Sequence, residues 1–320
     1  MSNIDLWTEK YRPSTLSDIY TNKNILSLLK YFIEIKNIPH IIIHGLYGNG
    51  KTSLILSIAQ DIFGKNEYKN KIIEFNASDE RGISVIRNKI KYFSKKKTSG
   101  KTNIPKWKIL ILDEADTLTT DSQFALRRIV EQYSRITKFC IICNNVDKII
   151  VPLISRCFVI HMPCIEKKLY IENLKNISIK ENINYNIKTL EFIYENTKND
   201  MRQGISILQM YSLSNKENQD YNIKKISCII NKKLFNIIFV NIKNKNIKNI
   251  NLLINYLYNN GYTLIKQLDL FFNYYLKLKI EDDKKYKLIL KLCDIEQNLL
   301  NNCNEYTQYI NLFYYMILIL

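Results

Sequence analysis

The sequence predicts a parallel α/β domain in the first half of the chain and an all-helical region in the rest. Four short apolar segments, at 40–45, 71–78, 107–114 and 138–145, are each separated from the next by a stretch with helical character. This alternation is typical of a parallel sheet covered by helices on both faces. From about residue 165 the strands stop, and apolar residues recur at helical spacing.

Length, charge and cysteine content narrow the class of protein. The 320 residues are enough for two or three domains with cores of their own. The formal net charge of +17 indicates a polyanionic partner. The first residues contain no apolar core or cleavage site, so we expect no signal peptide. Seven cysteines, an odd number, do not suggest a disulfide framework.

The elements of the α/β domain follow from short patterns. HIIIHG, at 40–45, ends in a glycine as a buried parallel strand does. KTSLILSIAQDIF then predicts a helix that Gly64 ends. The segments 71–78, 107–114 and 138–145 are the further strands, and the lysine- and glycine-containing segment 95–106 predicts a loop.

The second half of the chain is predicted to pack amphipathic helices together. A helix over 199–211 begins at a cap, Asn199 or Asp200, and has Met201, Ile205 and Leu208 on one side. Three more apolar stripes favour an all-α C-terminal domain. They are Ile247, Ile250, Ile254 and Leu257; then Leu264, Leu268, Phe271 and Tyr275; and last Leu288, Leu292, Ile295 and Leu299.

Two segments allow a second interpretation. Cys140 and Cys143 have the spacing of a zinc half-site or a redox pair, but they lie inside an apolar strand with no second pair at ligand distance. We expect them in the core. The C-terminal INLFYYMILIL is far shorter than the ~20 apolar residues of a spanning helix, so it predicts a packed last helix and no membrane partner.

A phosphate loop follows the first strand. GLYGNGKT, at 45–52, fits the pattern G-x-x-x-x-G-K-[ST] between a strand and a helix. Its backbone N–H groups and the helix N-terminus would bind phosphates, Lys51 would reach the β- and γ-phosphates, and Thr52 would hold Mg²⁺. The residues expected to bind nucleotide here are Gly45, Gly48, Asn49, Gly50, Lys51, Thr52 and Ser53.

A pair of carboxylates ends the third predicted strand. ILILDEAD, at 109–116, places Asp113 to hold Mg²⁺ and Glu114 to polarise the water that attacks the γ-phosphate. Acidic residues after a strand are often only solvated turn residues. The phosphate loop about sixty residues upstream favours the hydrolytic interpretation.

Signature segments make the chain resemble the small subunits of replication factor C, the eukaryotic sliding-clamp loader of the AAA+ class. The resemblance rests on WTEKYRP (7–13), NASDERGI (76–83) and SRC (155–157), and is strongest from Trp7 to Cys157. It implies an AAA+ ATPase domain over 1–163, a helical lid over 164–220 and a helical collar over 221–320. The family's two prolines and threonine in the phosphate loop are replaced by Leu46, Tyr47 and Asn49.

The resemblance also implies roles for individual residues. Tyr11, Arg12 and Pro13 would lie against adenine. Asn144, with Asn145 as the reserve choice, would sense the γ-phosphate, and Arg202 would be the lid sensor. Arg127 and Arg128 would face an adjacent subunit.

Arg156 stands out because only eight of the 47 Lys and Arg residues are arginine. In the family it would be the arginine finger, which acts on ATP held by the neighbouring subunit. The alternative is a surface arginine paired with a local carboxylate. Asp147 is the only acid close in sequence.

A basic segment suggests where DNA would bind. Residues 78–108 contain ten Lys and Arg against two acids. On a helix from about Ile83, Arg87 and Lys91 lie opposite the apolar face, and such a surface can follow a phosphate backbone without reading bases. With Arg81 they match the family's DNA-tracking surface, although a merely solvated lysine face is common in so lysine-rich a chain.

These observations together predict an ATP-hydrolysing, Mg²⁺-dependent clamp-loader subunit. The family implies a nuclear hetero-pentamer of replication factor C subunits that opens the sliding clamp PCNA and loads it on primer–template DNA. The alternatives are a structural subunit that binds nucleotide without hydrolysing it, or another AAA+ motor on nucleic acid.

Overall fold

The chain forms two compact units, residues 1–212 and 213–320. The computed structural model describes residues 6–64, 67–78, 86–95, 105–197, 199–213, 228, 230–278 and 280–320, without the side chains of 17, 23, 86, 87 and 232. The loop predicted over 95–106 therefore lies almost entirely outside the described residues.

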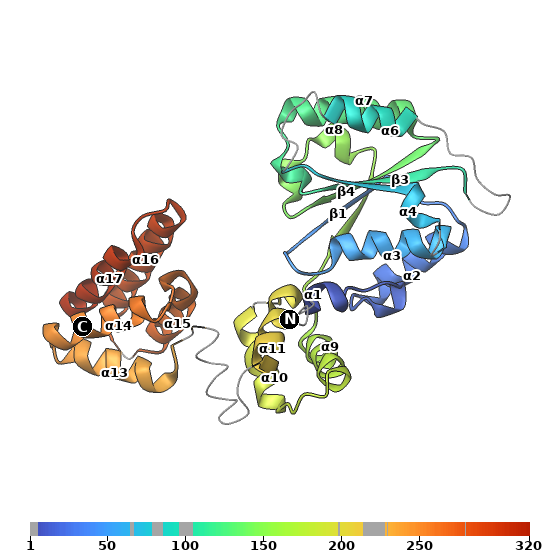
Figure 1. The fold of residues 1–320 in the computed structure, drawn as a ribbon. Coiled ribbons are helices and arrows are strands. Elements are labelled where there is room, and N and C mark those ends of the chain that lie inside the picture. The colour runs from blue at the N-terminus through green and yellow to red at the C-terminus, as the bar shows by residue number, and fades with distance from the viewer. Residues whose placement is uncertain are drawn as a thin grey trace. The chain divides into compact units, whose positions relative to one another are not determined.

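A five-stranded sheet forms the centre of the first unit, and all its strand pairs are parallel (Figure 1). The strand order is β2-β3-β4-β1-β5. The strands are β1 (Ile41–Gly45), β2 (Ile72–Asn76), β3 (Lys108–Asp113), β4 (Thr137–Cys143) and β5 (Phe158–Met162). The four predicted strands are confirmed. β5 was not predicted, because this edge strand has a short apolar run and largely exposed side chains.

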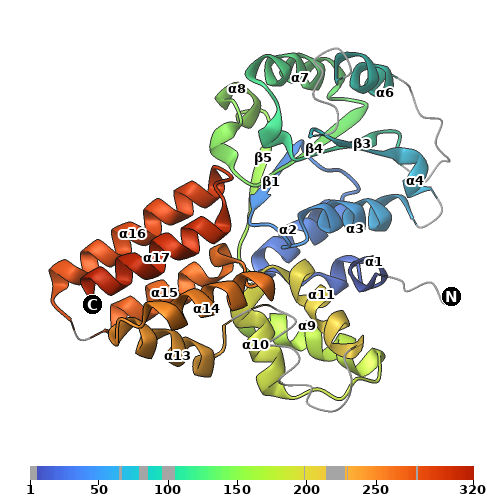
Figure 2. The same cartoon turned by 60° about the vertical axis from the view of Figure 1, so that its left-hand side comes forward.

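Helices cover both faces of the sheet, as the alternating pattern predicts. One face packs on α2 (Lys23–Glu34) and α3 (Lys51–Phe63), and the other on α6 (Lys91–Lys95), α7 (Thr120–Tyr133) and α8 (Val151–Ile154) (Figure 2). Ile41 and Ile43 point into the first core and Ile42 into the second, which is why the strand is apolar throughout. Gly64 ends α3 at φ +80°.

Shorter elements complete the first part of this unit. They are α1 (Trp7–Lys10), α4 (Tyr68–Lys71), the 3₁₀ turns η1 (Leu16–Asp18), η3 (Ala115–Thr117) and η4 (Val146–Lys148), and the π-helical η2 (Ile86–Ile90). The helix predicted from about Ile83 is thus a π-helical turn followed by the five-residue α6, and its predicted start lies outside the described residues. Ile90 is buried while Lys91 is exposed, as the pattern predicts.

Three further helices belong to the first unit: α9 (Lys167–Lys180), α10 (Ile187–Thr197) and α11 (Met201–Leu213). Met201, Ile205 and Leu208 of α11 are buried, which confirms the predicted stripe. Asp200 is the residue that caps this helix, since its Oδ1 accepts a hydrogen bond from the Gln203 N–H at 3.1 Å. Asn199 instead adopts a left-handed conformation.

The second unit contains helices only in its described residues. They are α13 (Lys232–Lys243), α14 (Ile247–Asn259), α15 (Leu264–Lys277), α16 (Asp282–Leu300) and α17 (Glu305–Ile319). Its core includes every residue of the predicted α15 stripe. The prediction was wrong for one member of the α14 stripe, because Ile247, at the first position of that helix, is 51% exposed. Leu299 is only partly buried against the core.

The C-terminal segment is the packed helix that the sequence predicts. Leu312, Phe313 and Met316 of α17 are completely buried in the core of the second unit. Among the described residues, no helix combines the length and apolar character needed to span a membrane.

Candidate functional site

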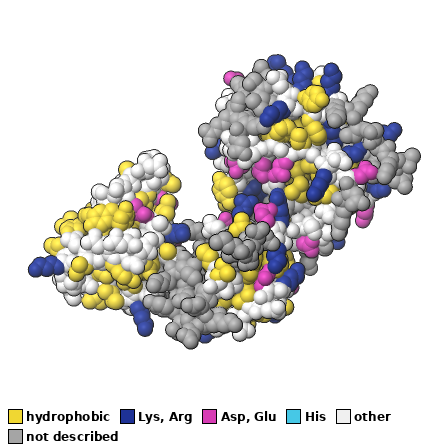
Figure 3. Space-filling model, viewed as in Figure 1, with side chains coloured by type: hydrophobic (Ala, Val, Ile, Leu, Met, Phe, Trp, Pro, Cys, Tyr) yellow, Lys and Arg dark blue, Asp and Glu magenta, His cyan; other side chains and the backbone are white. Residues whose placement is uncertain are grey.

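A cavity of about 790 Å³ lies in the first unit at the carboxyl ends of the strands, where parallel α/β sheets bind ligands. It joins residues far apart in sequence, from the start of the chain, the phosphate loop, the ends of β2 and β3, the residue after β4, α9 and α11. Among the predicted site residues, those that line it are Tyr11, Arg12, Pro13, Gly48, Asn49, Gly50, Lys51, Thr52, Ser53, Asp113, Glu114, Asn144 and Arg202. On the face in Figure 3, acidic and basic side chains stand side by side in this unit.

The phosphate loop turns through two left-handed glycines. Gly48 has φ +71° and Gly50, at the N-cap of α3, has φ +79°. L-residues other than Asn and Asp rarely adopt this conformation, so the glycines are needed for the loop's shape. Glycine is required at position 45 for another reason, because a Cβ there would stand 2.4 Å from the Met162 carbonyl oxygen of β5. The loop therefore presents its backbone and the N-terminus of α3 to the cavity.

Lys51 is directed along the loop toward β4. Its Nζ donates to the carbonyl oxygens of Gly45 and Leu46, each at 2.9 Å, and to Asn144 Oδ1 at 2.8 Å. The side chain is largely buried, and this burial lowers the pKa of the ammonium group. Asn144, the predicted sensor, thus shares the site with the predicted phosphate-binding lysine.

The reserve candidate for the sensor, Asn145, has a different role. Its Oδ1 accepts a hydrogen bond from the Asp147 N–H at 2.9 Å and caps η4. This geometry favours Asn144 over Asn145 as the residue near a γ-phosphate.

Thr52 and Asp113, the two predicted Mg²⁺ ligands, contact each other. The Thr52 hydroxyl donates to Asp113 Oδ2 at 2.6 Å. A hydroxyl and a carboxylate oxygen are the hard donors that Mg²⁺ binds. Beside the glycine loop and Lys51, this pair fits a nucleotide with its magnesium ion. No group of three or more His, Cys, Asp or Glu suited to a metal occurs among the described residues.

Glu114 follows directly and has an unusual backbone. Its φ of 53° is left-handed, and its N–H donates to Asp113 Oδ1 at 2.8 Å. Non-glycine residues in this conformation carry strain, which is commonest at functional sites. The conformation turns the chain at the end of β3 and places Glu114 in the cavity lining next to Asp113.

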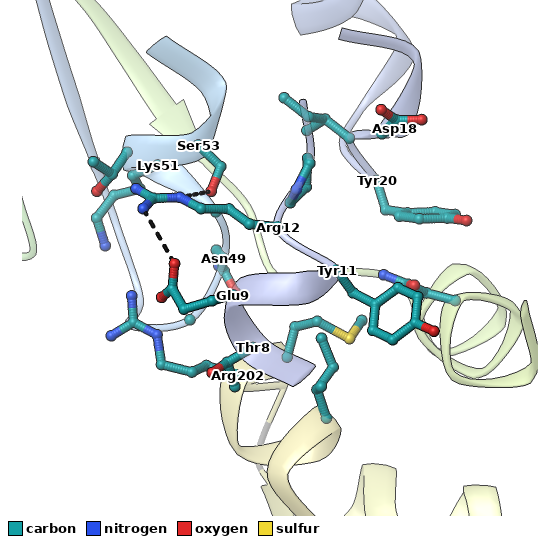
Figure 4. A pocket seen from close by; sticks show the side chains of 18 of the residues that line it. Thr8, Glu9, Tyr11, Arg12, Asp18, Tyr20, Asn49, Lys51, Ser53 and Arg202 are labelled. Atoms are coloured by element: carbon teal, nitrogen blue, oxygen red, sulfur yellow. Dashed lines mark hydrogen bonds and ion pairs between the residues drawn. The ribbon is translucent and has the colours of Figure 1, made fainter. Parts of the chain in front are cut away.

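The start of the chain forms another wall of the cavity (Figure 4). Arg12 Nε donates to Ser53 Oγ at 3.4 Å, and Arg12 Nη1 lies 3.7 Å from Glu9 Oε2. The Tyr11 hydroxyl donates to Glu181, the C-cap of α9, and Lys10 Nζ lies 2.6 Å from the same carboxylate oxygen. These two donors lower the pKa of Glu181. Of the residues predicted to lie against adenine, Arg12 therefore contacts α3 and Tyr11 contacts the end of α9.

Helix α11 contributes Arg202, which points into the cavity near Glu9 (Figure 4). Its charge is close enough to Lys51 to help lower the pKa of that lysine, although burial is the larger cause. The N-terminus of α11 also contacts the phosphate loop, since a Cβ on Gly48 would stand 1.9 Å from Asp200 Oδ1.

Asn49 has a contact that the sequence does not reveal. Its Nδ2 donates to the Pro163 carbonyl oxygen at 3.1 Å, just after β5, and the residue is 4% exposed. The phosphate loop is thus bonded to the segment that joins the sheet to α9. No pattern in the sequence predicts this partner, because it lies 114 residues away.

Arg156 is not among the residues that line this cavity. It lies in the turn after α8, and its Nε is 2.5 Å from Glu131 Oε1 in α7. The lack of acids near Arg156 in sequence, other than Asp147, argued against a surface ion pair, but the structure forms one. The carboxylate belongs to α7, which is too distant in sequence to be recognised as a neighbour of Arg156.

Other predicted residues lie outside the cavity. Arg81 and the side chain of Arg87 are outside the described residues, and Lys91 is exposed on α6. Arg127 forms an ion pair with Glu131 at 3.0 Å. Cys140 and Cys143 are buried, and burial raises the pKa of the Cys143 thiol to about 12, so neither residue resembles a reactive or metal-binding thiolate.

Gln123 is a buried residue that the sequence interpretation missed. Its Nε2 donates to the carbonyl oxygens of Leu118 and Lys148, and its Oε1 accepts from the Ile150 N–H at 2.8 Å. The side chain thereby links the segment after β3 to the segment that leads into α8. A glutamine within a helix gives no sequence signal of such a role.

Comparison with known proteins agrees with this geometry. The model of the AAA family, ATPases associated with various cellular activities, matches residues 41–163. The model of the replication factor C C-terminal domain matches residues 230–314. The RuvB Holliday junction branch migration motor of Thermotoga maritima is similar in structure, with a TM-score of 0.53 over 74% of this chain and 80% of that one. At 16% identity this likeness shows the fold alone.

Relatives in sequence identify the family. The replication factor C small subunit of Aeropyrum pernix is 44% identical over 65% of this chain, and the match spans 62% of that protein. Replication factor C subunit 2 of Saccharomyces cerevisiae is 41% identical over 64% of this chain and 60% of its own length. Subunit 2 of Schizosaccharomyces pombe is 34% identical over 96% of this chain and 92% of its own. The chain therefore belongs to the replication factor C small-subunit family, with an AAA ATPase domain followed by a helical C-terminal region.

Proposed function

We propose that the chain is an ATP-hydrolysing subunit of a clamp loader. The observation that carries this proposal is the single cavity that combines the glycine loop, Lys51, the Thr52–Asp113 pair, Glu114 and Asn144. Phosphoryl transfer needs positioning and neutralisation of charge, and these residues supply donors, a carboxylate base and a metal-binding pair at one place. Glu114 would orient and polarise the attacking water, and Asn144 would hold it against the γ-phosphate.

The nucleotide would lie along the cavity. The loop N–H groups and Lys51 would bind its phosphates, while the base would lie toward Tyr11, Arg12 and Pro13. Mg²⁺, held by Thr52 and Asp113, would neutralise charge on the phosphate oxygens. Arg202 would connect nucleotide binding to the helices α9–α11, because it extends from α11 into the same cavity. Gly45 would keep the loop close to β5, and Ser53 would hold Arg12 beside the loop.

The position of Arg156 outside this chain's own cavity supports a role in an assembly. We propose that it completes the site of a neighbouring replication factor C subunit, in a hetero-pentamer, and that this chain's own site is completed in the same way. The relatives' names support assembly with other subunits of the complex. The complex would open PCNA and load it on primer–template DNA in the nucleus, with Arg81, Arg87 and Lys91 along the DNA backbone. Residues 1–163, 164–220 and 221–320 would be the ATPase, lid and collar parts.

ATP hydrolysis by the purified chain tests this function. It is measured alone and then with the other loader subunits, the clamp and primer–template DNA. We expect negligible turnover alone and a large rise on assembly, of which the share due to this chain's site disappears in Glu114→Gln. A rise that Glu114→Gln leaves intact would mean that this subunit binds nucleotide only as a scaffold, and vigorous turnover alone would favour an independent motor.

A further inference from the structure

One carboxylate holds two arginines on the surface of the first unit. Glu131 Oε1 lies 2.5 Å from Arg156 Nε and 3.0 Å from Arg127 Nε. Arg127 and Glu131 stand one turn apart on α7, whereas Arg156 comes from the turn after α8. The contact between Glu131 and Arg156 therefore joins two separate elements.

The Nη1 nitrogen of Arg156 has hydrogen-bond partners of its own. It donates to the Pro152 carbonyl oxygen at 2.6 Å and to Ser155 Oγ at 3.3 Å. Both acceptors belong to α8 or its C-cap, within four residues of Arg156, so they restrict the group only locally. Among the described residues, Glu131 contacts the guanidinium from another element, and this contact favours one direction of the side chain.

The charges around Glu131 favour its ionised form. Hydrogen bonding from Arg127, with a further contribution from Arg156, lowers the pKa of this carboxyl. Without the carboxylate, the two guanidiniums would be neighbouring like charges. Glu131 therefore permits both arginines to occupy the same small area.

We propose that Glu131 is a positioning residue for Arg156, which holds the guanidinium extended from α8 in the conformation that reaches a neighbouring subunit's nucleotide. This inference rests on the proposed function, in which Arg156 acts in trans. It assigns to Glu131 no contact with the nucleotide. Its effect on the reaction passes through Arg156 alone.

The strength of the Glu131–Arg156 ion pair decides whether Glu131 positions Arg156 or holds it away from a neighbour's nucleotide. The side chains of Arg156 and Glu131 are 35% and 40% exposed, and exposed ion pairs change an equilibrium by less than about tenfold. A finger contributes about 10³- to 10⁵-fold to phosphoryl transfer. So weak a pair cannot withhold Arg156 from a phosphate, but it does reduce the rotamers that the free side chain samples. Loss of Glu131 should therefore slow the neighbour's turnover about three- to tenfold, much less than loss of Arg156.

The test uses the assembled complex, with only the neighbouring subunit's ATPase site left intact. Arg156→Ala, Glu131→Ala and the double variant are compared, and Glu172→Gln on α9 serves as a control that removes a carboxylate elsewhere in the same unit. We expect Glu131→Ala to lower the neighbour's kcat with KM unchanged, and the double variant to match Arg156→Ala. Glu131→Gln, which keeps the shape of the side chain, should give a smaller loss than Glu131→Ala.

Each contrary outcome has a distinct meaning. If Arg156→Ala slows the neighbour but Glu131→Ala does not, or if the double variant is slower than Arg156→Ala, the positioning role is wrong and the finger role stands. If Arg156→Ala has no effect, the finger role itself is wrong and this inference falls with it. Unchanged tryptophan fluorescence of each variant checks that the first unit is folded, because Trp7 and Trp107 both lie there.

Discussion

Two glycines of the phosphate loop share a left-handed backbone but differ in their surroundings. A Cβ on Gly50 would meet nothing within 4 Å among the described residues, whereas one on Gly48 would stand 1.9 Å from Asp200 Oδ1. The left-handed conformation costs an L-residue about 1–2 kcal/mol. Only Gly48 adds a clash with the N-terminus of α11.

Alanine at these two positions should therefore have unequal effects. We expect Gly50→Ala to destabilise the first unit by about 1–2 kcal/mol, and Gly48→Ala by more, since Asp200 must also move. Urea unfolding followed by tryptophan fluorescence measures this, because both tryptophans belong to the first unit. In an Asp200→Ala background the difference between the two variants should shrink. Equal midpoints for Gly48→Ala and Gly50→Ala would contradict the predicted clash.

The roles of Lys51, Asp113 and Glu114 were predicted from local spacing, and these residues do meet in one cavity. They meet there because the carboxyl ends of parallel strands share one edge of the sheet. The partner of Arg156 could not be predicted in this way. Glu131 lies 25 positions away on another helix, and no periodic pattern links the two.

At the scale of elements, His40 connects three strands at the start of β1. Its Nδ1 accepts a hydrogen bond from the Phe139 N–H of β4 at 3.2 Å, and its carbonyl oxygen accepts from the Phe158 N–H of β5 at 2.7 Å. Burial lowers the pKa of this histidine from 6.5 to about 4. Protonation would also remove the acceptor that Phe139 uses.

This shift makes the stability of the sheet depend on pH. Because the folded pKa lies below the unfolded one, the stabilisation is complete above pH 6.5 and is lost as pH falls toward about 4. We expect the urea midpoint of the first unit to fall more between pH 7 and pH 5 in the natural chain than in His40→Asn. Val159→Ala, at an exposed position of β5 without a titratable group, is the control and should leave the pH dependence as it is. Parallel profiles for the natural chain and His40→Asn would show that His40 is not the cause.

The fold of single elements was predictable to different degrees. β1, β3 and β4 are buried on both faces of the sheet, so their sequences are nearly continuous apolar runs. β5 is an edge strand with Phe158, Val159 and His161 exposed, and it lacks that signal. Residues 86–90 form a π-helical turn, although their apolar spacing predicted an ordinary helix. A backbone hydrogen-bond pattern of this kind leaves no trace in hydrophobic periodicity.

At the scale of the molecule, the chain has separate cores in its two units. Phe271 is completely buried in the second unit, with its ring 5.3 Å from Phe235 and 5.9 Å from Phe313 between centroids. None of these residues takes part in the cores on either face of the sheet. The two units should accordingly respond separately to mutations in their cores.

Phe271→Ala tests this separation. Removing a buried phenylalanine costs about 3–5 kcal/mol, so we expect the helical unit to lose most of its stability. Circular dichroism at 222 nm should then show an early transition, while tryptophan fluorescence, which reports on the first unit, keeps its midpoint. Leu290→Ala, at an exposed position on the next helix, should change neither signal. A parallel shift of both signals would mean that the units unfold as one.

The sequence by itself determined four of the five strands of the described sheet, the phosphate loop and the carboxylates after β3. These features depend on residue spacing within about fifteen positions, where periodicity and glycine conformations act directly. Only the tertiary structure decided which distant groups meet: Glu131 with Arg156, Glu181 with Tyr11, and Asn49 with the Pro163 carbonyl. Those contacts depend on how the whole fold brings distant segments together, and no local pattern encodes that.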